Sequence, residues 1–564
     1  MLTHARPLAT RLAELSDAQL ERLLRVRGVR PDAAWEDFFD AAEALLDTAS
    51  VERALATLTP AEARILVDAV DGERAAPSET LDALALIDGE GRVPAPIAAV
   101  VATRGGIAEP DEATAEPASA ASAARAAERA FTTVGALADL LLAARARPLT
   151  LVATGALSAG ERKRLAESGA DAGPADDLRI IAETACLARA VERELHVTDA
   201  AERWLAESFS DRWVTLAEAF RADLPRGLRS GAGWIPLPRW PSAHPWDPSW
   251  PAHAETLLRL ARLLGLSTEE GTEPEWAAAL RRGDAAETAA LDALLPTEVD
   301  RLFLQNDLTA IAPGPLQPAL DNRLRAMTKH HTSAQASSYR FTADSIALAL
   351  VEGETAESIL TFLRDVSLTG VPQPLEYLVT QTAARHGLVR VSRRRDGATV
   401  VSSVDSHLLG AIAVDRGLRP LGLVRERDEL TSRVNAETVA WALADAKYPA
   451  TLVGDDGAPV PASRHRLAAP AREPAGSYAP LIARLRARHG PDADAAWLDR
   501  ELDAAVRVRA LVAVEVAMPD GSSRELVLEA SGLGGGRLRG RDRAADVERT
   551  LPVRSIRSVR MLES

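Results

Sequence analysis

A carboxylate and two amides interrupt an apolar stretch in the middle of the chain. Gln305, Asn306 and Asp307 stand between the apolar runs 302–304 and 308–312, and Pro313-Gly314-Pro315 closes the stretch. At the end of a buried strand, such a carboxylate could hold the magnesium ion of a nucleotide-hydrolysing enzyme. The alternative is a tight turn, because Asn and Asp side chains bond readily to nearby backbone groups.

The sequence lacks the motif with which an ATP-driven motor binds its nucleotide. A P-loop cradles phosphates with backbone amides and places a lysine directly after a glycine. The chain has lysine only at Lys163, Lys329 and Lys447, which follow Arg, Thr and Ala. We therefore predict no ATPase and no other enzyme activity, and we read Gln305-Asn306-Asp307 as a turn between two strands.

Other arrangements that could do chemistry are weak. His330 and His331 are adjacent, so their rings point in different directions on a helix or a strand. The acidic box 111–114 (DEAT) lies in a polar, alanine-rich segment without a strand to present it. No Gly-x-Ser-x-Gly elbow occurs. We expect no catalytic residues, no metal site and no cofactor.

Local arginine clusters are the strongest chemical signal. Residues 393–395 are all arginine, and residues 533–564 carry eight arginines against four acids. Guanidinium groups form charge-assisted hydrogen bonds with phosphates, and side-chain amides can form hydrogen bonds with base edges. A solvated surface is the alternative reading of both clusters. The predicted nucleic-acid-binding residues are Gln381, Arg385, Arg393, Arg394, Arg395, Arg539, Arg541, Arg549, Arg554 and Arg557.

The first cluster belongs to a pattern of three helices and a hairpin over 341–402. Thr342 and Thr355 are suited to cap the first two helices, and Pro374 to open the third. The third helix would expose Gln381 and Arg385, and Asp396-Gly397, directly after the three arginines, marks a hairpin turn. This pattern predicts a winged helix, with the third helix and the wing toward nucleic acid.

Looser versions of the same pattern cover 131–200 and 59–104. Beyond about residue 510, short apolar strands alternate with turn signals, which predicts a small, strongly bent sheet or barrel. The segment 233–251 alternates prolines with tryptophans. Those tryptophans are expected to pack onto neighbouring helices, with a stacking platform for bases as the alternative.

The bulk composition limits the function classes. The chain has 564 residues, too many for one core, and its net charge is −15. Any nucleic-acid site must therefore be a local basic patch. A single cysteine, Cys186, excludes a disulfide framework. The N-terminus lacks the apolar core of a signal peptide, and no apolar run is long enough to span a membrane, so we expect a cytoplasmic protein.

These observations predict an α+β, helix-rich multidomain protein. The expected divisions are an N-terminal helical or winged-helix-like domain (1–104), a flexible linker (105–130), a helical domain with a winged-helix-like unit (131–294), a domain with a winged helix (295–402), a small α/β segment with a linker (403–476), and a β domain (477–564).

The stretches "LFLQNDLTAIAPGPL", "SSYRFTADSIALALVEG", "FLRDVSLTGVPQPLEYLV" and "ARHGLVRV" resemble the domain that precedes the motor in bacterial XPB-type helicases. The same module occurs in stand-alone actinobacterial helicase-associated proteins. The resemblance covers about 295–402 and implies an accessory domain that engages DNA. The motor motifs are absent, so it does not imply helicase activity.

The segment from "ELDAAVRVRALVAVEVAMPDGSSRELVLEASGL" through "RLRGRDRAADVERTLPVRSIRSV" is similar to WYL domains, although the Trp-Tyr-Leu tripeptide is missing. That similarity implies an Sm-like barrel whose basic residues bind nucleic acid or nucleotide-like ligands.

The resulting expectation is a non-catalytic DNA-binding accessory protein, in DNA repair or transcription regulation, that works with a helicase or repair or transcription protein. The alternative is a protein-interaction scaffold or nucleotide-ligand sensor acting through the WYL-like domain.

Overall fold

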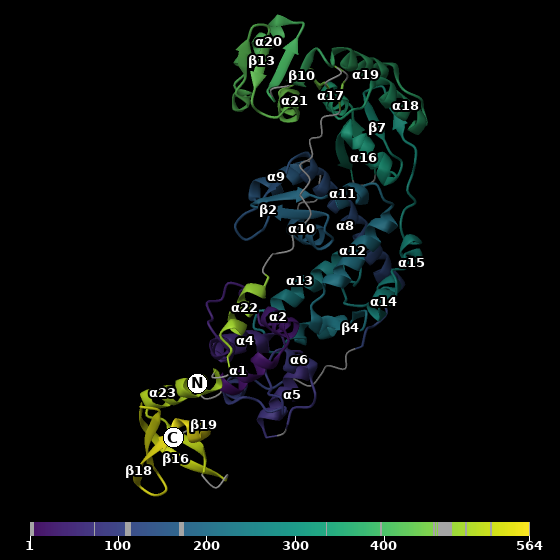
Figure 1. The fold of residues 1–564 in the computed structure, drawn as a ribbon. Helices are drawn as coiled ribbons and strands as arrows, with labels where there is room; N and C mark the ends of the chain where they lie inside the picture. Colours follow the sequence, from purple (N-terminus) through teal and green to yellow (C-terminus); the bar gives the residue numbers. More distant parts are fainter. Residues whose placement is uncertain are drawn as a thin grey trace.

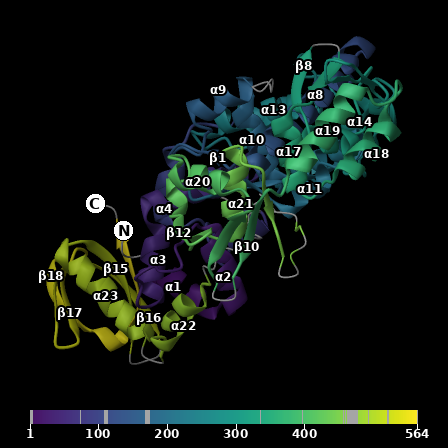
Figure 2. The ribbon, with the colours of Figure 1, turned by 90° about the horizontal axis from the view of Figure 1, so that it is seen from above.

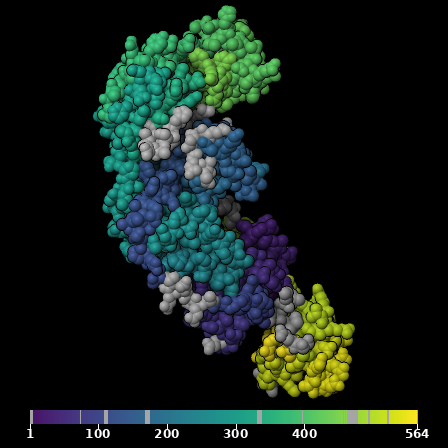
Figure 3. Space-filling view, turned by 180° about the vertical axis from the view of Figure 1, so that it is seen from behind, coloured from purple at the N-terminus to yellow at the C-terminus, as the bar shows by residue number. Residues whose placement is uncertain are grey.

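The molecule is an elongated α+β protein with small, mostly antiparallel sheets (Figure 1). The last strands of the chain lie at one end, and the segment around residue 400 lies at the other, as opposite views show (Figures 1 and 3). No helix in the described ranges has both the length and the apolar composition needed to cross a membrane. The computed structural model describes residues 5–72, 74–107, 114–167, 174–333, 336–394, 397–454, 457, 459–460, 477–490, 493–518 and 522–562.

The N-terminal unit is a bundle of short helices. Capping boxes begin two of them, at Ser16 and Thr59, because each hydroxyl accepts a helix amide that would otherwise lack a partner. Large side chains such as Phe38 and Phe39 are fully buried in its core. The helices are α1 (Ala5–Glu14), α2 (Asp17–Val26), α3 (Phe38–Leu46), α4 (Thr48–Ala56), α5 (Pro60–Val70), α6 (Glu79–Ala83) and α7 (Ala95–Ala102).

Two helices from the end of the chain complete this N-terminal core. α22 (Ala479–Ala487) inserts Leu481 and Leu485, and α23 (Ala493–Arg507) inserts Trp497, among the residues of α1–α7. The yellow sheet lies beside the purple helices for this reason (Figure 2). The predicted β domain 477–564 is therefore not a separate unit, because apolar residues at its start, from Tyr478 to Trp497, share a core with residues 5–101.

The middle unit contains three helices and a short hairpin over 120–197, with a further strand after the first helix, and its first sheet has the strand order β1-β3-β2. Its elements are α8 (Ala120–Ala146), β1 (Leu149–Thr150), α9 (Ala159–Glu167), α10 (Ala175–Thr184), β2 (Ala188–Val191), β3 (Glu194–Val197), α11 (Asp199–Trp204), α12 (Phe209–Asp223), β4 (Arg229–Ser230), β5 (Gly233–Trp234), α13 (Trp250–Leu263), α14 (Glu275–Arg282) and α15 (Ala289–Asp292).

The predicted flexible linker, 105–130, is helical from Ala120 onward. Ala126 and Ala130 are buried, and the chain at Gly265 comes so close that a Cβ there would lie 2.6 Å from the Ala126 carbonyl oxygen. Small side chains permit this close approach, so the alanine-rich segment from Ala120 onward packs in the middle core and is not a linker. The acidic residues Asp111 and Glu112 lie outside the described residues.

The tryptophans of 233–251 are structural. Trp234, Trp240 and Trp250 are buried in the middle core, and Trp246 packs into the N-terminal core. The indole N–H of Trp250 donates to the Trp240 carbonyl oxygen at 2.7 Å. Packing onto neighbouring elements is confirmed, and the alternative of an exposed stacking platform is wrong.

The third unit pairs a sheet of order β6-β7-β9-β8 with the three predicted helices. Thr342 and Thr355 each form a capping box, and Pro374 lies in the first turn of the third helix, as predicted. The elements are β6 (Phe303–Leu304), β7 (Thr309–Ile311), α16 (Pro318–Ala326), β8 (Lys329–Ser333), β9 (Ala336–Arg340), α17 (Ala343–Val351), α18 (Ala356–Val366) and α19 (Gln373–Arg385).

The predicted wing is the centre of another sheet, called here the hairpin sheet. The hairpin β10–β11 forms, but β13 pairs with β11 and β14 pairs with β10, giving the order β12-β13-β11-β10-β14. Val389, Val391 and Val401 are buried against the helices that follow the hairpin. The elements are β10 (Val389–Arg393), β11 (Thr399–Ser403), α20 (Ser406–Val414), β12 (Val424–Glu426), β13 (Glu429–Ser432), α21 (Ala436–Asp445) and β14 (Ala450–Leu452).

Two predictions change as a result. The arrangement over 341–402 is not confirmed as a winged helix, because the hairpin packs mainly in a different core from α17–α19. The boundary at 402 also falls inside a sheet, since β11 and β13 lie on either side of it and pair directly.

The C-terminal sheet has the order β18-β17-β16-β15-β19 and packs on α23 through Leu498 and Leu502. A bulge between Ala530 and Gly532 interrupts the long strand β16, as a bent sheet requires. Within the described residues no pairing joins β18 to β19, so the predicted closed barrel is not found. The strands are β15 (Leu511–Ala517), β16 (Ser523–Gly534), β17 (Arg537–Asp542), β18 (Val547–Pro552) and β19 (Ile556–Leu562).

Candidate nucleic-acid interface

The polar stretch Gln305-Asn306-Asp307 is the turn between β6 and β7. Asp307 Oδ1 accepts the backbone N–H of Thr309 at 3.1 Å, and the Gln305 N–H donates to the Thr309 carbonyl at 2.8 Å. Leu308 adopts a positive φ of 67° to complete the turn. The prediction of a turn is confirmed, and the local hydrogen bond explains why a carboxylate stands there.

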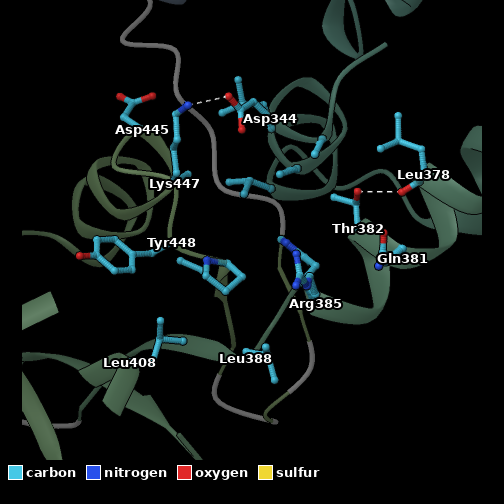
Figure 4. Close-up of a pocket in the computed structure, with 18 of the residues that line it drawn as sticks. Asp344, Leu378, Gln381, Thr382, Arg385, Leu388, Leu408, Asp445, Lys447 and Tyr448 are labelled. Carbon is cyan, nitrogen blue, oxygen red and sulfur yellow. Dashed lines mark hydrogen bonds and ion pairs between the residues drawn. The ribbon is translucent and has the colours of Figure 1, made fainter. Parts of the chain in front are cut away.

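Gln381 and Arg385 line a cleft of about 620 Å³. The cleft lies between α17 and α19 on one side and the hairpin sheet with the end of α21 on the other. Figure 4 shows Gln381 and Arg385 coming from one helix and Lys447 and Tyr448 from the opposite side. The two predicted residues therefore face a gap between two cores.

Most charges around this cleft already have partners. Lys447 Nζ lies 3.0 Å from Asp344 Oδ2, and Asp405 Oδ1 accepts the amides of His407 and Leu408 at the start of α20. Arg385 differs, since no described carboxylate pairs with its exposed guanidinium. Among the described residues that line the cleft, Arg385 and the exposed Lys329 are thus the cations without a described carboxylate partner.

The hairpin tip places Arg393 beside an arginine that the sequence argument missed. Arg393 and Arg433 both border a hollow of about 380 Å³, where α21 begins at its N-cap Asn435. Both arginines are exposed, and no described carboxylate pairs with either. The positive end of the α21 dipole adds to their field, while Glu437 at the rim opposes it.

The other hairpin arginines stand differently. Arg394 lies 3.6 Å from Glu426 Oε2 of β12, so part of its charge is balanced. Arg395 lies outside the described residues. The sheet that places Arg433 near Arg393 joins strands about 30 residues apart, and the sequence contains no local signal for that pairing.

The C-terminal arginines divide into paired and unpaired groups. Arg541 pairs with Asp546, and Arg549 Nε lies 2.5 Å from the buried carboxylate of Asp542. Arg557 donates to the Ser523 hydroxyl at 3.2 Å. Arg539 and Arg554 are exposed and have no described ion-pair partner.

Arg537 joins the unpaired group, and the register places it near both of those residues. Arg537 stands opposite Pro552, two residues before Arg554, and lies two residues before Arg539 on the same face of β17. The described structure therefore holds two distant sets of available arginines, because the hairpin sheet and the C-terminal sheet lie at opposite ends of the molecule (Figure 1).

A family model described as "helicase conserved C-terminal domain" matches residues 302–427. The matched segment runs from the start of the third unit through β12, so it contains Gln381, Arg385, Arg393 and Arg394. The search of curated proteins finds no match. The chain is thus similar to a helicase domain over this segment, which supports a helicase-related protein with a function linked to nucleic acids.

Proposed function

We propose that this protein is a non-catalytic accessory of helicase-related machinery that binds DNA through the hairpin sheet. The observation that carries the proposal is the placement of Arg393 and Arg433, both without a described carboxylate partner, on one hollow at the hairpin tip. Arg393 lies within the helicase-like segment. Arginine side chains of this kind bind phosphate oxygens through charge-assisted hydrogen bonds.

The absence of a motor is part of this proposal. No lysine in the sequence follows a glycine, so the loop that binds the phosphates of ATP in P-loop enzymes is missing. The strand-end carboxylate of Asp307 is engaged in its own turn. An accessory role, in DNA repair or transcription regulation beside a helicase, accommodates both facts and the resemblance to the domain preceding the XPB motor.

A salt titration of binding to fluorescent DNA tests the proposal. Affinity should fall steeply as salt rises, and Arg393→Ala should reduce the slope by about one, the loss of one phosphate contact. Arg419→Ala is the matched control, since Arg419 is exposed on the same unit but away from the hollow. Absence of binding at low salt, or ATP turnover by the purified protein, would refute the proposal.

A second candidate is a scaffold or nucleotide-ligand sensor that works through the C-terminal sheet. It is supported by Arg537, Arg539 and Arg554, which are unpaired in the described structure and share one end of that sheet. The WYL-like resemblance implies ligand binding by such residues. Retention of full DNA affinity after Arg393 and Arg433 are both replaced by alanine would favour this candidate.

A further inference from the structure

The cleft beside α19 shares no lining residue with the hollow at the hairpin tip, so phosphate binding at that hollow does not involve it. We propose that it holds one unstacked base of a single-stranded nucleic acid, with a neighbouring phosphate on Arg385. The inference rests on the proposed function and adds to it a preference for single strands. The residues that would do this are Gln381, Arg385, His386 and Tyr448, together with the apolar wall.

Two fixed rings line the cleft. The Tyr448 hydroxyl donates to Asp415 Oδ2 at 3.0 Å, and His386 Nε2 lies 2.7 Å from the Thr451 hydroxyl. Burial lowers the pKa of His386, which keeps its ring neutral near pH 7. Bases stack on aromatic rings of this kind without regard to sequence, and rings held in place lose less entropy on binding.

The rest of the lining is mixed, with apolar side chains beside the carboxylates of Asp344, Asp405 and Asp445. Leu348, Leu378, Leu388 and Leu408 form the apolar part of the lining. The apolar part excludes water from a base, and the carboxylates repel a phosphate. The phosphate must therefore lie toward a cation at the rim.

Arg385 and Gln381 provide complementary polar groups one turn apart on α19. The guanidinium of Arg385 has no described carboxylate partner, unlike Lys447, which pairs with Asp344. Arg385 can take a phosphate, and the Gln381 amide can meet the edge of a base. Figure 4 shows these two side chains on the side of the cleft opposite Tyr448.

The size of the cleft favours a single nucleotide unit. A volume of about 620 Å³ is within the range of pockets that enclose small ligands, roughly 300–1,000 Å³. In a duplex the bases are stacked inside and cannot enter such a pocket unless they are flipped out at an energetic cost. A single strand presents unstacked bases directly.

The test compares the affinity of the full-length chain for fluorescent oligothymidylate, for the same strand with abasic sites, and for a duplex of equal length. Tyr448→Leu, and Ala343→Trp, which fills the cleft from an exposed helix position, should each weaken single-strand binding about fivefold or more. Duplex affinity should change much less. Tyr448→Phe keeps the ring and should retain binding, and Arg385→Gln should weaken it while Arg419→Gln does not.

The outcomes separate the two proposals. If wild-type protein binds no DNA at low salt, the proposed function and this inference both fall. Suppose that wild-type protein binds DNA and that Arg393→Ala weakens this binding. If the cleft variants then bind as wild-type protein does, and the abasic strand binds as well as the intact strand, only the base-binding cleft is refuted. That second result would indicate that the cleft serves another occupant, such as an apolar protein segment. Thermal unfolding of each variant checks that lost binding does not come from lost folding.

Discussion

The hairpin sheet and the C-terminal sheet both have five strands and both carry arginines, yet their arginines are placed in different ways. In the hairpin sheet, pairing between distant strands puts Arg393 and Arg433 on one hollow with no described carboxylate partner. In the C-terminal sheet, Arg541 and Arg549 meet acids of their own hairpin. A count of arginines therefore predicts local charge, whereas the number available to a phosphate depends on which strands pair.

The largest expected effect tests whether DNA binds the arginines that have no described carboxylate partner. Charge reversal of both Arg393 and Arg433 to Glu should weaken DNA binding tenfold or more, because each charge-assisted contact contributes about 1.5–3 kcal/mol. The same reversal of Arg541 and Arg549 should have a much smaller effect on affinity, since those arginines already have partners. Fluorescence anisotropy at fixed salt measures both. Equal losses would remove the distinction between the two sheets.

The next effect concerns how the C-terminal sheet is held. Arg500 of α23 pairs with Asp40 at 2.8 Å and lies over the Phe39 ring, 4.3 Å from its centroid. Arg500→Ala should lower the free energy of unfolding by about 1–2 kcal/mol, after allowance for its partial exposure. Chemical denaturation measures this loss. Arg507→Ala, which removes only an exposed pair within the same helix, is the control and should change stability by less than about 0.5 kcal/mol.

A third effect is a dependence of stability on pH, which arises where the middle unit contacts the N-terminal unit. Arg226 of the middle unit pairs with Glu62 of α5 at 2.6 Å. Burial raises the pKa of Glu62, but hydrogen bonds from Arg226 and the Thr59 amide outweigh it, and the pKa falls from 4.5 to about 2. The pair therefore adds stability above about pH 4.5, which is lost as the pH falls toward 2.

Glu62→Gln removes the group that titrates and should flatten this part of the acid-unfolding profile. Because Arg226 is half exposed, the loss of stability at neutral pH should be modest, about 1 kcal/mol. Circular dichroism across pH 2–6 provides the comparison. An unchanged slope would mean that other carboxylates control acid unfolding.

The smallest expected effect is at the turn between β6 and β7. Asp307→Ala removes one exposed hydrogen bond to the Thr309 amide and should cost about 0.5–1 kcal/mol, with DNA affinity unchanged. Asp307→Asn retains an acceptor oxygen and should be nearly neutral. A loss of binding in both variants at unchanged stability would restore the hypothesis that this carboxylate acts in a site.

Sequence reasoning succeeded where structure is local. The N-caps Thr342 and Thr355, the turn at Asp307 and the hairpin β10–β11 all depend on residues within a few positions of one another. It failed for pairings over long separations. The strand β13 pairs with β11 and so places the predicted wing at the centre of a sheet. This strand follows the predicted boundary at 402, and the residues near Arg393 give no signal of the pairing.

The residues of the candidate site likewise fall into those predicted from local pattern and those that only long-range packing brings together. The exposure of Arg385, Arg393 and Arg539 follows from helix and strand periodicity. Arg433, His386 and Tyr448 were missed because only the packing of α19 and α21 around the hairpin sheet brings them to a cleft or hollow. The alanines of 120–130 were misjudged since their contribution is close approach of backbones rather than buried area.

The shared core of α1–α7 with α22 and α23 has a consequence for synthesis of the protein. A ribosome makes the first seven helices long before it makes Trp497, which fills their core. During translation of nearly 400 intervening residues, the apolar surface that α22 and α23 later cover must stay open to solvent or to a chaperone. Contacts between residues about 450 positions apart, such as that of the Tyr478 hydroxyl with the carbonyl of Val29 at a separation of 449 and that of Arg500 with Asp40 at 460, can form only after α22 and α23 have been made. Completion of the N-terminal core is therefore a late step of folding, although most of its sequence emerges first.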